Sequence, residues 1–346
     1  MFREVNDSGP VGKRPTITVV IPTLNSGRTL SACLESIKNQ DYSGRIEIVI
    51  ADGGSTDETI TVASAYDCVI VQNPKKTAEA GKAAGLKVAS GEIIALIDSD
   101  NILPERDWLR RMTAPFSDPE IAGSEPIEYT YRRTDSGLTR YCALLGMNDP
   151  LCYFLKNYDR RSVLSGKWTG LDIETHDRGD YLEVHLRPEA IPTMGANGFL
   201  LRKELLDVLQ VGGYLFDIDI IHDLVMSGHS TFAKVKTGIV HLYGSGLRTF
   251  SRKQLRRVRD FHYYSSLGMR SYPWSTRKKA GVLKFIVYCL LLVPLVYQSI
   301  KGYRRQPDTA WGLHLPACLI TLAVYALGVI EGVVKPREQA RTRWRQ

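Results

Sequence analysis

Two short acidic clusters carry the side chains with the clearest chemical meaning in this chain. The first is the run DGGSTD that begins at Asp52, and the second is the run DSD that begins at Asp98. Each follows a β-branched apolar run, at 46–51 and at 93–97, so each falls where a buried parallel strand would end. Ligands of open α/β sheets bind at that edge, and carboxylates two residues apart suit Mg²⁺ or Mn²⁺ bridging a diphosphate. The clusters therefore predict a nucleotide diphosphate held through a divalent metal.

The elements that must position these clusters alternate between strand and helix. Apolar runs predict strands over 16–21, 46–51, 68–71 and 93–97. Apolar residues at helical spacing predict helices over 27–38, from 56 or 57 onward, and over about 78–89. Because such alternation produces a parallel sheet wrapped by helices, the predicted fold class is α/β.

Four sequence blocks follow one another over about the first 105 residues. They are VVIPTLN from Val19, DGGSTDET from Asp52, AGKAAGL from Ala80, and SGE from Ser90 followed by the DSD run. In this order and spacing they resemble the glycosyltransferases of family 2, whose GT-A fold is a mostly parallel sheet flanked by helices. The resemblance implies a hexosyltransferase-type enzyme that needs Mg²⁺ or Mn²⁺ and takes a nucleotide-diphospho-sugar donor, with UDP expected before GDP.

The resemblance also implies roles for residues of the donor half, 15–105. The nucleobase and ribose would be held by residues at the first two strand ends: Pro22, Thr23, Asn25 and Asp52. Asp98 and Asp100 form the metal side, with Asp100 as a ligand and Asp98 at the ribose or a metal-bound water. The metal would neutralise charge on the departing nucleoside diphosphate. Lys82 stands where the family often has a basic residue near the nucleotide, and a solvated helix lysine is the alternative.

The acceptor half, 106–250, would supply the catalytic base. In the run FDID, Asp217 takes the place of the aspartate that deprotonates the acceptor hydroxyl, while Phe216 replaces the family's usual glutamate. Asp219 is the second choice for the base. An aspartate is ionised near neutrality and needs positioning more than tuning. One base without a second nucleophile predicts single displacement with inversion.

Three further residues of this half are assigned from the same resemblance. Gly195 and Asn197 lie in the run MGANGF, which is similar to a small-residue segment that lets donor and acceptor approach the backbone; a tight turn is the alternative. His241 stands where GT-A folds often place a metal ligand, after the apolar run 237–240. A hydrogen-bonded histidine at a strand end is the alternative reading of that position.

The run QLRRV from Gln254 resembles the QxxRW motif of membrane-embedded processive synthases, with Val258 in place of the tryptophan. Gln254 and Arg257 are therefore assigned to the acceptor and membrane side. Trp168 comes from a stretch with little family pattern and could stack on a sugar ring or simply pack. Without the motif's tryptophan, we expect transfer of one sugar per encounter.

The basic character of the chain belongs to its last quarter. Residues 251–346 carry 18 Lys or Arg and four Asp or Glu, a net charge of +14, whereas the whole chain is +8. The same quarter holds apolar stretches at 281–300 and 311–334, each near the roughly 20 residues that span a bilayer. Basic flanks beside apolar stretches predict membrane anchoring and argue against a nucleic-acid partner. Buried or interfacial helices are the alternative to two transmembrane helices.

These observations divide the chain into segments. The segments are a polar tail at 1–14, a GT-A catalytic domain at 15–250, a basic amphipathic interface helix and linker at 251–280, transmembrane helices at 281–300 and 311–334, and a basic tail at 335–346. The polar tail lacks the apolar core of a secretory signal, and the outer flanks are more basic than the link between the apolar stretches. We therefore expect a multi-pass protein of the cell membrane with a cytoplasmic catalytic domain.

The leading functional prediction is an inverting glycosyltransferase of cell-envelope glycan synthesis that acts on a lipid-linked acceptor, such as a polyprenyl phosphate or a glycolipid. A membrane-tethered enzyme with a soluble glycan or protein acceptor is the second possibility. A protein that binds sugar nucleotides without turnover is the third. The base at Asp217 argues against the third, because binding alone does not require a base.

Overall fold

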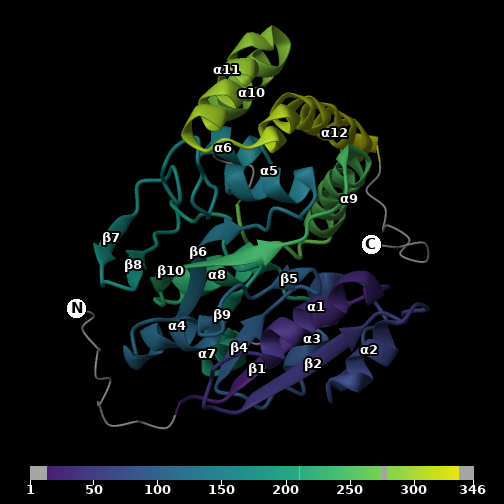
Figure 1. The fold of residues 1–346 in the computed structure, drawn as a ribbon, viewed down its shortest axis with the longest axis vertical. Helices are drawn as coiled ribbons and strands as arrows, with labels where there is room; N and C mark the ends of the chain where they lie inside the picture. The colour runs from purple at the N-terminus through teal and green to yellow at the C-terminus, as the bar shows by residue number, and fades with distance from the viewer. Residues whose placement is uncertain (1–13, 210, 274–278, 335–346) are drawn as a thin grey trace.

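A single mixed sheet, built from strands between Ile17 and His241, forms the centre of the fold (Figure 1). The computed structural model describes residues 14–209, 211–273 and 279–334. The strands are β1 (Ile17–Thr23), β2 (Ile46–Asp52), β3 (Val69–Gln72), β4 (Ile93–Leu96), β5 (Asn101–Ile102), β6 (Gly123–Thr130), β7 (Glu174–Asp177), β8 (Tyr181–His185), β9 (Phe199–Arg202) and β10 (Thr231–His241). Their order is β3-β2-β1-β4-β9-β6-β10-β8-β7, with β5 paired to β10.

Helices follow most of the strands and cover both faces of the sheet. They are α1 (Gly27–Lys38), α2 (Thr59–Ala65), α3 (Ala78–Leu86), α4 (Trp108–Thr113), α5 (Gly137–Leu145), α6 (Leu151–Leu155), α7 (Lys203–Leu209), α8 (Asp217–Met226), α9 (Leu247–Ser266), α10 (Lys279–Leu291), α11 (Val293–Arg305) and α12 (His314–Val334), with short 3-10 turns η1 (Ala114–Ser117) and η3 (Thr309–Leu313).

The donor half has the predicted alternation of strands and helices. β3, β2, β1 and β4 are all parallel, and the predicted helix over 27–38 is α1. Alternate residues of β1 enter different cores, because successive side chains of a strand point to opposite faces. Val19 and Ile21 pack with α1 in one core, while Val20 packs with Ala83 of α3 in the other. The predicted α/β fold is confirmed.

The acceptor half completes the sheet with mixed pairing. β9 runs antiparallel to both β4 and β6, so it joins the two halves. β10 is parallel to β6 and antiparallel to β8, and β7 and β8 form a hairpin at the far edge. This arrangement brings the end of β10, at His241, to the same region as the turn after β4.

The first predicted transmembrane helix, 281–300, is not one helix. α10 and α11 meet at Leu292, whose φ is +60°, and their axes are bent by 94°. Pro294 lies in the first turn of α11, where its missing N–H costs no helical hydrogen bond. The single helix predicted over 281–300 is therefore two helices, and its crossing of a membrane stays a prediction.

The second apolar stretch does form one long helix. Residues Thr309–Glu331 are long and apolar enough to cross a membrane by length and composition, although a third of that window is buried against the rest of the chain. The predicted basic tail at 335–346, all but the last residue of the predicted polar tail 1–14, and residues 274–278 of the predicted linker lie outside the described residues.

The C-terminal helices pack on the catalytic domain. Trp311 lies in a buried cluster with Tyr141 of α5, and Phe285 of α10 lies in another with Phe154 of α6. α12 runs along α9, where Gly328 faces Val258 so closely that a Cβ on the glycine would lie 2.1 Å from the valine Cγ1. Val258 thus contacts a helix at the position where the QxxRW motif has its tryptophan.

We expect Val258→Trp to destabilise the protein, because α12 leaves no room for an indole at this site. Overpacking of this kind costs about 1–3 kcal/mol, and thermal unfolding followed by circular dichroism measures it. Val88→Trp, at an exposed position, is the control and should leave the melting temperature unchanged. An unchanged melting temperature for Val258→Trp would contradict the packing of α12 on α9.

Candidate active site

A pocket opens where the carboxyl ends of β1 and β4 meet the acceptor half. Nine of the residues assigned from sequence line it: Pro22, Thr23, Lys82, Asp98, Asp100, Asn197, Asp217, His241 and Arg257. They come from the ends of β1 and β10, from the turn between β4 and β5, from the segment before β9, from the first residue of α8 and from two other helices, α3 and α9. The edge of the sheet that the acidic clusters predicted is therefore the edge where the pocket forms.

Two glycines of α3 bring Lys82 into the pocket. A Cβ on Gly81 would lie 2.8 Å from the Pro22 Cβ, and one on Gly85 would lie 2.4 Å from a Val20 methyl. Only glycine therefore lets α3 pack this closely against β1. Thr77 caps the helix by accepting a hydrogen bond from the Ala80 N–H at 3.1 Å. Lys82 is thus fixed by the two glycines on either side of it, Gly81 and Gly85, which pack against β1.

Lys82 joins the donor half to the base assigned from sequence. Its Nζ lies 2.6 Å from Asp217 Oδ1 and 3.9 Å from Asp98 Oδ1. Burial alone would lower the pKa of Lys82, but the carboxylates of Asp217 and Asp98 hold it above its ordinary value. Burial raises the pKa of Asp217 to about 6, although the ion pair with Lys82 opposes the rise. Asp217 is thus held as an ion-paired carboxyl that ionises close to neutral pH.

Asp100 forms the second charged centre of the pocket. Its Oδ1 lies 3.4 Å from His241 Nε2, and its Oδ2 lies 3.3 Å from Lys253 Nζ. Burial alone would raise the pKa of Asp100, but His241 and Lys253 hold it well below its ordinary value. A hydrogen-bonding contact of 3.2 Å between Asn148 Nδ2 and His241 Nδ1 orients the imidazole.

These residues fit a divalent metal. Carboxylate oxygen and imidazole nitrogen are ligands that Mn²⁺ accepts, and Mg²⁺ commonly binds one or two carboxylates and completes its shell with water and substrate phosphates. Asp100 and His241 already lie together, and Asp98 lines the same pocket with its side chain partly exposed. The only three-residue His, Cys, Asp or Glu cluster of the described chain with all ligand atoms within 4.8 Å is elsewhere, at His176, Glu183 and His185. Arg178 bonds both oxygens of that Glu183.

The small-residue segment after Met194 connects the two halves of the pocket. Asn197 Oδ1 accepts a hydrogen bond of 3.0 Å from Asn101, the first residue of β5, directly after the turn that carries Asp98 and Asp100. Gly195 has a φ of +107°, and a Cβ there would lie 2.6 Å from the Asp217 carbonyl oxygen. Gly195 does not line the pocket, but its lack of a side chain lets this segment pass beside Asp217.

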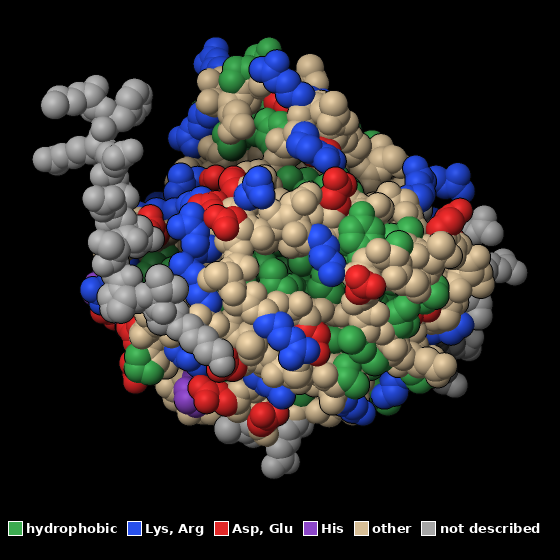
Figure 2. All heavy atoms as spheres, turned by 60° about the horizontal axis from the view of Figure 1, so that its bottom comes forward, with side chains coloured by type: hydrophobic (Ala, Val, Ile, Leu, Met, Phe, Trp, Pro, Cys, Tyr) green, Lys and Arg blue, Asp and Glu red, His purple; other side chains and the backbone are tan. Residues whose placement is uncertain are grey.

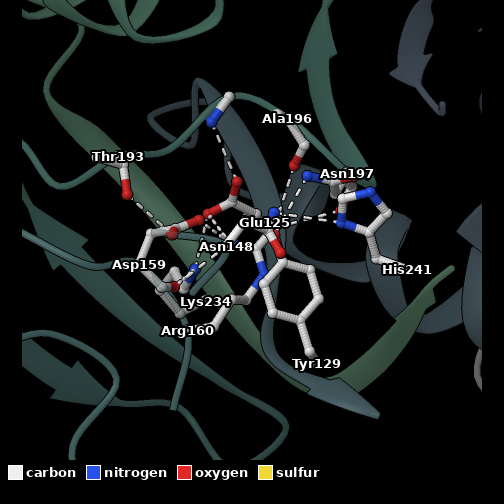
Figure 3. Close-up of polar contacts among 11 residues, drawn as sticks. Glu125, Tyr129, Asn148, Asp159, Arg160, Thr193, Ala196, Asn197, Lys234 and His241 are labelled. Carbon is white, nitrogen blue, oxygen red and sulfur yellow. Dashed lines mark hydrogen bonds and ion pairs between the residues drawn. The ribbon is translucent and has the colours of Figure 1, made fainter. Parts of the chain in front are cut away.

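A buried group of charges supports that segment from below (Figure 3). We call it the buried charge network; its members are Glu125 of β6, Asp159, Arg160 and Lys234 of β10. Arg160 lies 2.6 Å from Glu125, also pairs with Asp159, and donates to the carbonyl oxygens of Ala196 and Asn197 at 3.1 and 3.2 Å. Lys234 lies 2.7 Å from Glu125. Two positive and two negative side chains thus compensate one another.

Burial and the neighbouring charges shift the pKa values of Lys234 and Glu125 within the network. Burial lowers the pKa of Lys234 to about 8, and Glu125 opposes that change. Burial alone would raise the pKa of Glu125, but Arg160 and Lys234 hold it below its ordinary value. Glu125 therefore stays ionised between two cations and also accepts a hydrogen bond of 3.1 Å from the Gly195 N–H.

The structure uses two of the residues assigned to the nucleoside to build turns. Asp52 accepts hydrogen bonds from Thr23 Oγ1 at 2.9 Å and from the N–H groups of Gly54 and Ser55 at 2.8 Å. Asn25 adopts a φ of +53° and accepts a hydrogen bond from the Thr56 N–H at 2.9 Å. Both side chains lie outside the pocket lining and shape the loops of its donor end.

Three other assigned residues also lie away from the pocket. Asp219 accepts hydrogen bonds from Arg270 at 2.6 Å and from the Ser271 N–H at 2.6 Å, so it anchors the segment after α9. These contacts occupy the Asp219 carboxylate outside the pocket, which does not suit a catalytic base. Gln254 is buried and donates to the Asn148 carbonyl at 2.7 Å. Trp168 lines a separate hollow beside β8.

Several residues of the site had no signal that sequence patterns could detect. Lys253 and Tyr243 line the pocket, and Asn148 orients His241. The members of the buried charge network are scattered over more than 100 positions, so their spacing predicts nothing. One usable signal was Lys234, a lysine inside the apolar run of a central strand, where an unpaired charge would be costly.

We expect Arg160→Met to destabilise the protein by about 3–5 kcal/mol, because it leaves Glu125 and Asp159 buried with Lys234 as the remaining cation of the network. Urea unfolding measures the change. The matched control is Arg161→Met: Arg161 is 54% exposed and lies 3.9 Å from Glu128, so its removal should change little. Equal effects of the two substitutions would contradict the role given to the network.

Comparison with known proteins places these observations in a family. The family described as Glycosyl transferase family 2 matches residues 18–207, more than half of the 346-residue chain. An N-acetylglucosaminyltransferase of Rhizobium sp. (strain N33) is 32% identical over 135 residues, which are 36% of this chain and 30% of that protein. A PGL/p-HBAD biosynthesis glycosyltransferase of Mycobacterium tuberculosis (strain ATCC 25177 / H37Ra) is 33% identical over 123 residues, 34% of this chain and 46% of that protein. The matches span less than half the length of these relatives.

Solved structures are more distant in sequence. The mannosyltransferase PcManGT from Pyrobaculum calidifontis, in complex with GDP-Man and Mn²⁺, has a TM-score of 0.49 and 18% identity, with 93% of this chain and 82% of that chain covered. The predicted preference for UDP over GDP stays a prediction. By the match that covers residues 18–207, this chain belongs to glycosyltransferase family 2.

Proposed function

We propose that this protein transfers one sugar from a nucleotide-diphospho-sugar to a lipid-linked acceptor at a membrane surface, with inversion at the anomeric carbon. The observation that carries the proposal is the continuity of one pocket. It runs from the β1 end, past the paired charges of Asp217 and Asp100, to the basic face of α9, which also packs against the apolar α12.

The donor would lie along the ends of β1 and β4. Pro22 and Thr23 line that part of the pocket, together with Asn73 and Thr77. Lys82 is the buried cation nearest to this end, and its charge would attract the donor diphosphate. Asp100 and His241, with Asp98 beside them, would hold Mg²⁺ or Mn²⁺, which when bound supplies compensation for the negative charge of the leaving diphosphate.

Asp217 is proposed as the base. As the acceptor oxygen bonds to the anomeric carbon, the bond to the diphosphate oxygen breaks and its electron pair leaves with the nucleoside diphosphate. The acceptor hydroxyl proton passes to Asp217 Oδ. The ion pair with Lys82 fixes this carboxylate in the pocket, which is the positioning that general-base catalysis requires.

The basic residues of α9 support a lipid-linked acceptor. Lys253 and Arg257 line the pocket at the end where α9 packs against α12, so an anionic head group there would lie next to the apolar C-terminal helices. A soluble glycan or protein acceptor remains the second candidate. We assign the membrane association to the C-terminal helices and place the catalytic domain on the cytoplasmic side.

We expect Asp217→Asn to lower kcat by about 10²–10⁴-fold with a hydroxyl acceptor while donor binding is retained, because the acceptor proton then has no base. In the wild type, kcat/KM should rise about tenfold per pH unit up to the Asp217 pKa of about 6 and then level off, since kcat/KM follows the free enzyme and only the ionised carboxylate accepts a proton. This limb should vanish in Asp217→Asn. Asp223→Asn, on an exposed position of the same helix, is the control; unchanged turnover in Asp217→Asn would remove Asp217 as the base.

The direct test is nucleoside diphosphate release by the purified protein with Mn²⁺, across a panel of UDP- and GDP-sugars, with and without polyprenyl phosphate or glycolipid. We expect release that depends on lipid acceptor and stops with EDTA. Release indifferent to lipid but stimulated by soluble glycans would favour the second candidate. Donor binding without any release would favour a sugar-nucleotide-binding protein.

A further inference from the structure

The elbow formed by α10 and α11 carries a large bare apolar surface. It projects beyond α12 at the top of the molecule (Figure 1). Leu290 is 73% exposed and Val293 is 74% exposed, on either side of the bend at Leu292. Further exposed apolar side chains continue along both arms: Leu283, Val287, Leu291, Val296, Tyr297 and Ile300. Soluble proteins rarely expose this many large apolar side chains along two adjoining helices.

The opposite side of the elbow is firmly attached to the protein. Phe285 packs against Phe154 with ring centroids 5.1 Å apart, and Leu295 is fully buried. A Cβ on Gly302 would lie 2.5 Å from the Trp311 ring, so α11 lies directly on that indole. These contacts hold the elbow in one orientation, with its exposed apolar side facing outward. The exposed side chains are therefore not covered by other parts of the described chain.

The charges of the elbow match an anionic lipid surface. Residues 279–305 contain five Lys or Arg and no Asp or Glu, whereas acidic side chains lie among the basic ones over the face shown in Figure 2. The five cations are in the first turns of α10 and the last turns of α11, away from Leu292: Lys279, Lys284, Lys301, Arg304 and Arg305. An apolar corner with cations at its base suits insertion of the corner while the cations stay among the head groups.

The elbow is too short and too bent to cross a bilayer. Each arm has 13 residues, or about 20 Å at the rise of an α-helix, while the hydrocarbon core is about 30 Å thick. The chain also returns to the catalytic domain directly after it. Arg305 donates to the Val163 and Leu164 carbonyls at 2.8 and 2.7 Å, and Asp308 lies 3.4 Å from Arg140.

α12 is also held on the catalytic domain along its length. Near its start, His314 Nδ1 lies 2.8 Å from the Tyr141 hydroxyl. Tyr325 donates to Asp149 at 2.6 Å, and Glu331 in the last turns pairs with Arg259 of α9 at 2.6 Å. A transmembrane α12 would carry the charged residues of α9 into the hydrocarbon with it, which is costly.

We propose that the elbow inserts into a single leaflet of an anionic bilayer, and that neither it nor α12 crosses the membrane. The described C-terminal helices would then hold the catalytic domain on one membrane face, with α9 beside the head groups. This inference rests on the membrane association proposed above, but its tests do not use turnover, so a wrong acceptor or donor would leave them unaffected.

The first test is flotation of the full chain with vesicles of phosphatidylcholine and phosphatidylglycerol at 3:1. We expect the wild type to float with these vesicles, less so with pure phosphatidylcholine or in high salt, and the double substitution L290E/V293E to reduce the bound fraction at least tenfold. Met226→Glu is the matched control, because Met226 is 62% exposed on α8, outside the elbow. Undiminished flotation of L290E/V293E, or no flotation of the wild type, would overturn the proposal.

The second test asks on which side of the membrane the end of α11 lies. Tyr303 lies at that end and is 51% exposed. The Tyr303→Cys protein, bound to the outside of sealed vesicles, is treated with a membrane-impermeant maleimide. Lys87→Cys in the catalytic domain is the reference, and the wild type gives the background from native cysteines. We expect both positions to label without permeabilisation. Labelling of Tyr303→Cys only after permeabilisation would show that the chain crosses the bilayer and would overturn the single-leaflet arrangement.

Discussion

The ion pairs of Arg160 are the interaction on which the acceptor half depends. One terminal nitrogen of the guanidinium, Nη1, joins Glu125 of β6 and Asp159, and the other, Nη2, donates to the backbone carbonyl oxygens of Ala196 and Asn197. The two terminal nitrogens of a planar guanidinium can meet acceptors from different elements at once, which the single ammonium group of a lysine could not do. Because the 194–198 segment passes beside Asp217 and bonds the turn after β4, the position of the proposed base and of the metal side both follow from this buried contact.

α9 connects the pocket to the proposed membrane surface. One side of the helix turns Lys253 and Arg257 toward the pocket, while Val258 and Arg259 contact α12. A single 20-residue helix therefore separates the reacting groups from the apolar C-terminal elements. An acceptor with a charged head and an apolar chain fits this arrangement, because both parts find a suitable surface within the width of one helix.

The donor half could be predicted because its signals are local. The strand ends before Asp52 and Asp98, the glycines around Lys82 and the apolar spacing of α1 all lie within short runs, and the structure has each of them where the pattern indicates. The structure nevertheless uses Asp52 and Asn25 in turns. Asp52 accepts hydrogen bonds from its neighbours Gly54 and Ser55 as well as from Thr23, and Asn25 accepts one from Thr56 of the distant loop after β2. Asp219 and Trp168 were assigned by their position in the sequence. In the structure Asp219 pairs with Arg270, and Trp168 lines a separate hollow.

Residue type and spacing were sufficient to predict the alternation of strands and helices, the edge of the sheet where carboxylates gather, and the apolar character of the C-terminal quarter. These follow from side-chain type and spacing over a few residues. The folded chain was needed to show which carboxylate pairs with Lys82, which charges compensate one another beside the 194–198 segment, and in which directions the apolar helices run. Those outcomes depend on contacts between residues far apart in the chain, and a hydropathy pattern records how apolar a segment is but not the bend at Leu292 or the surface that the segment meets.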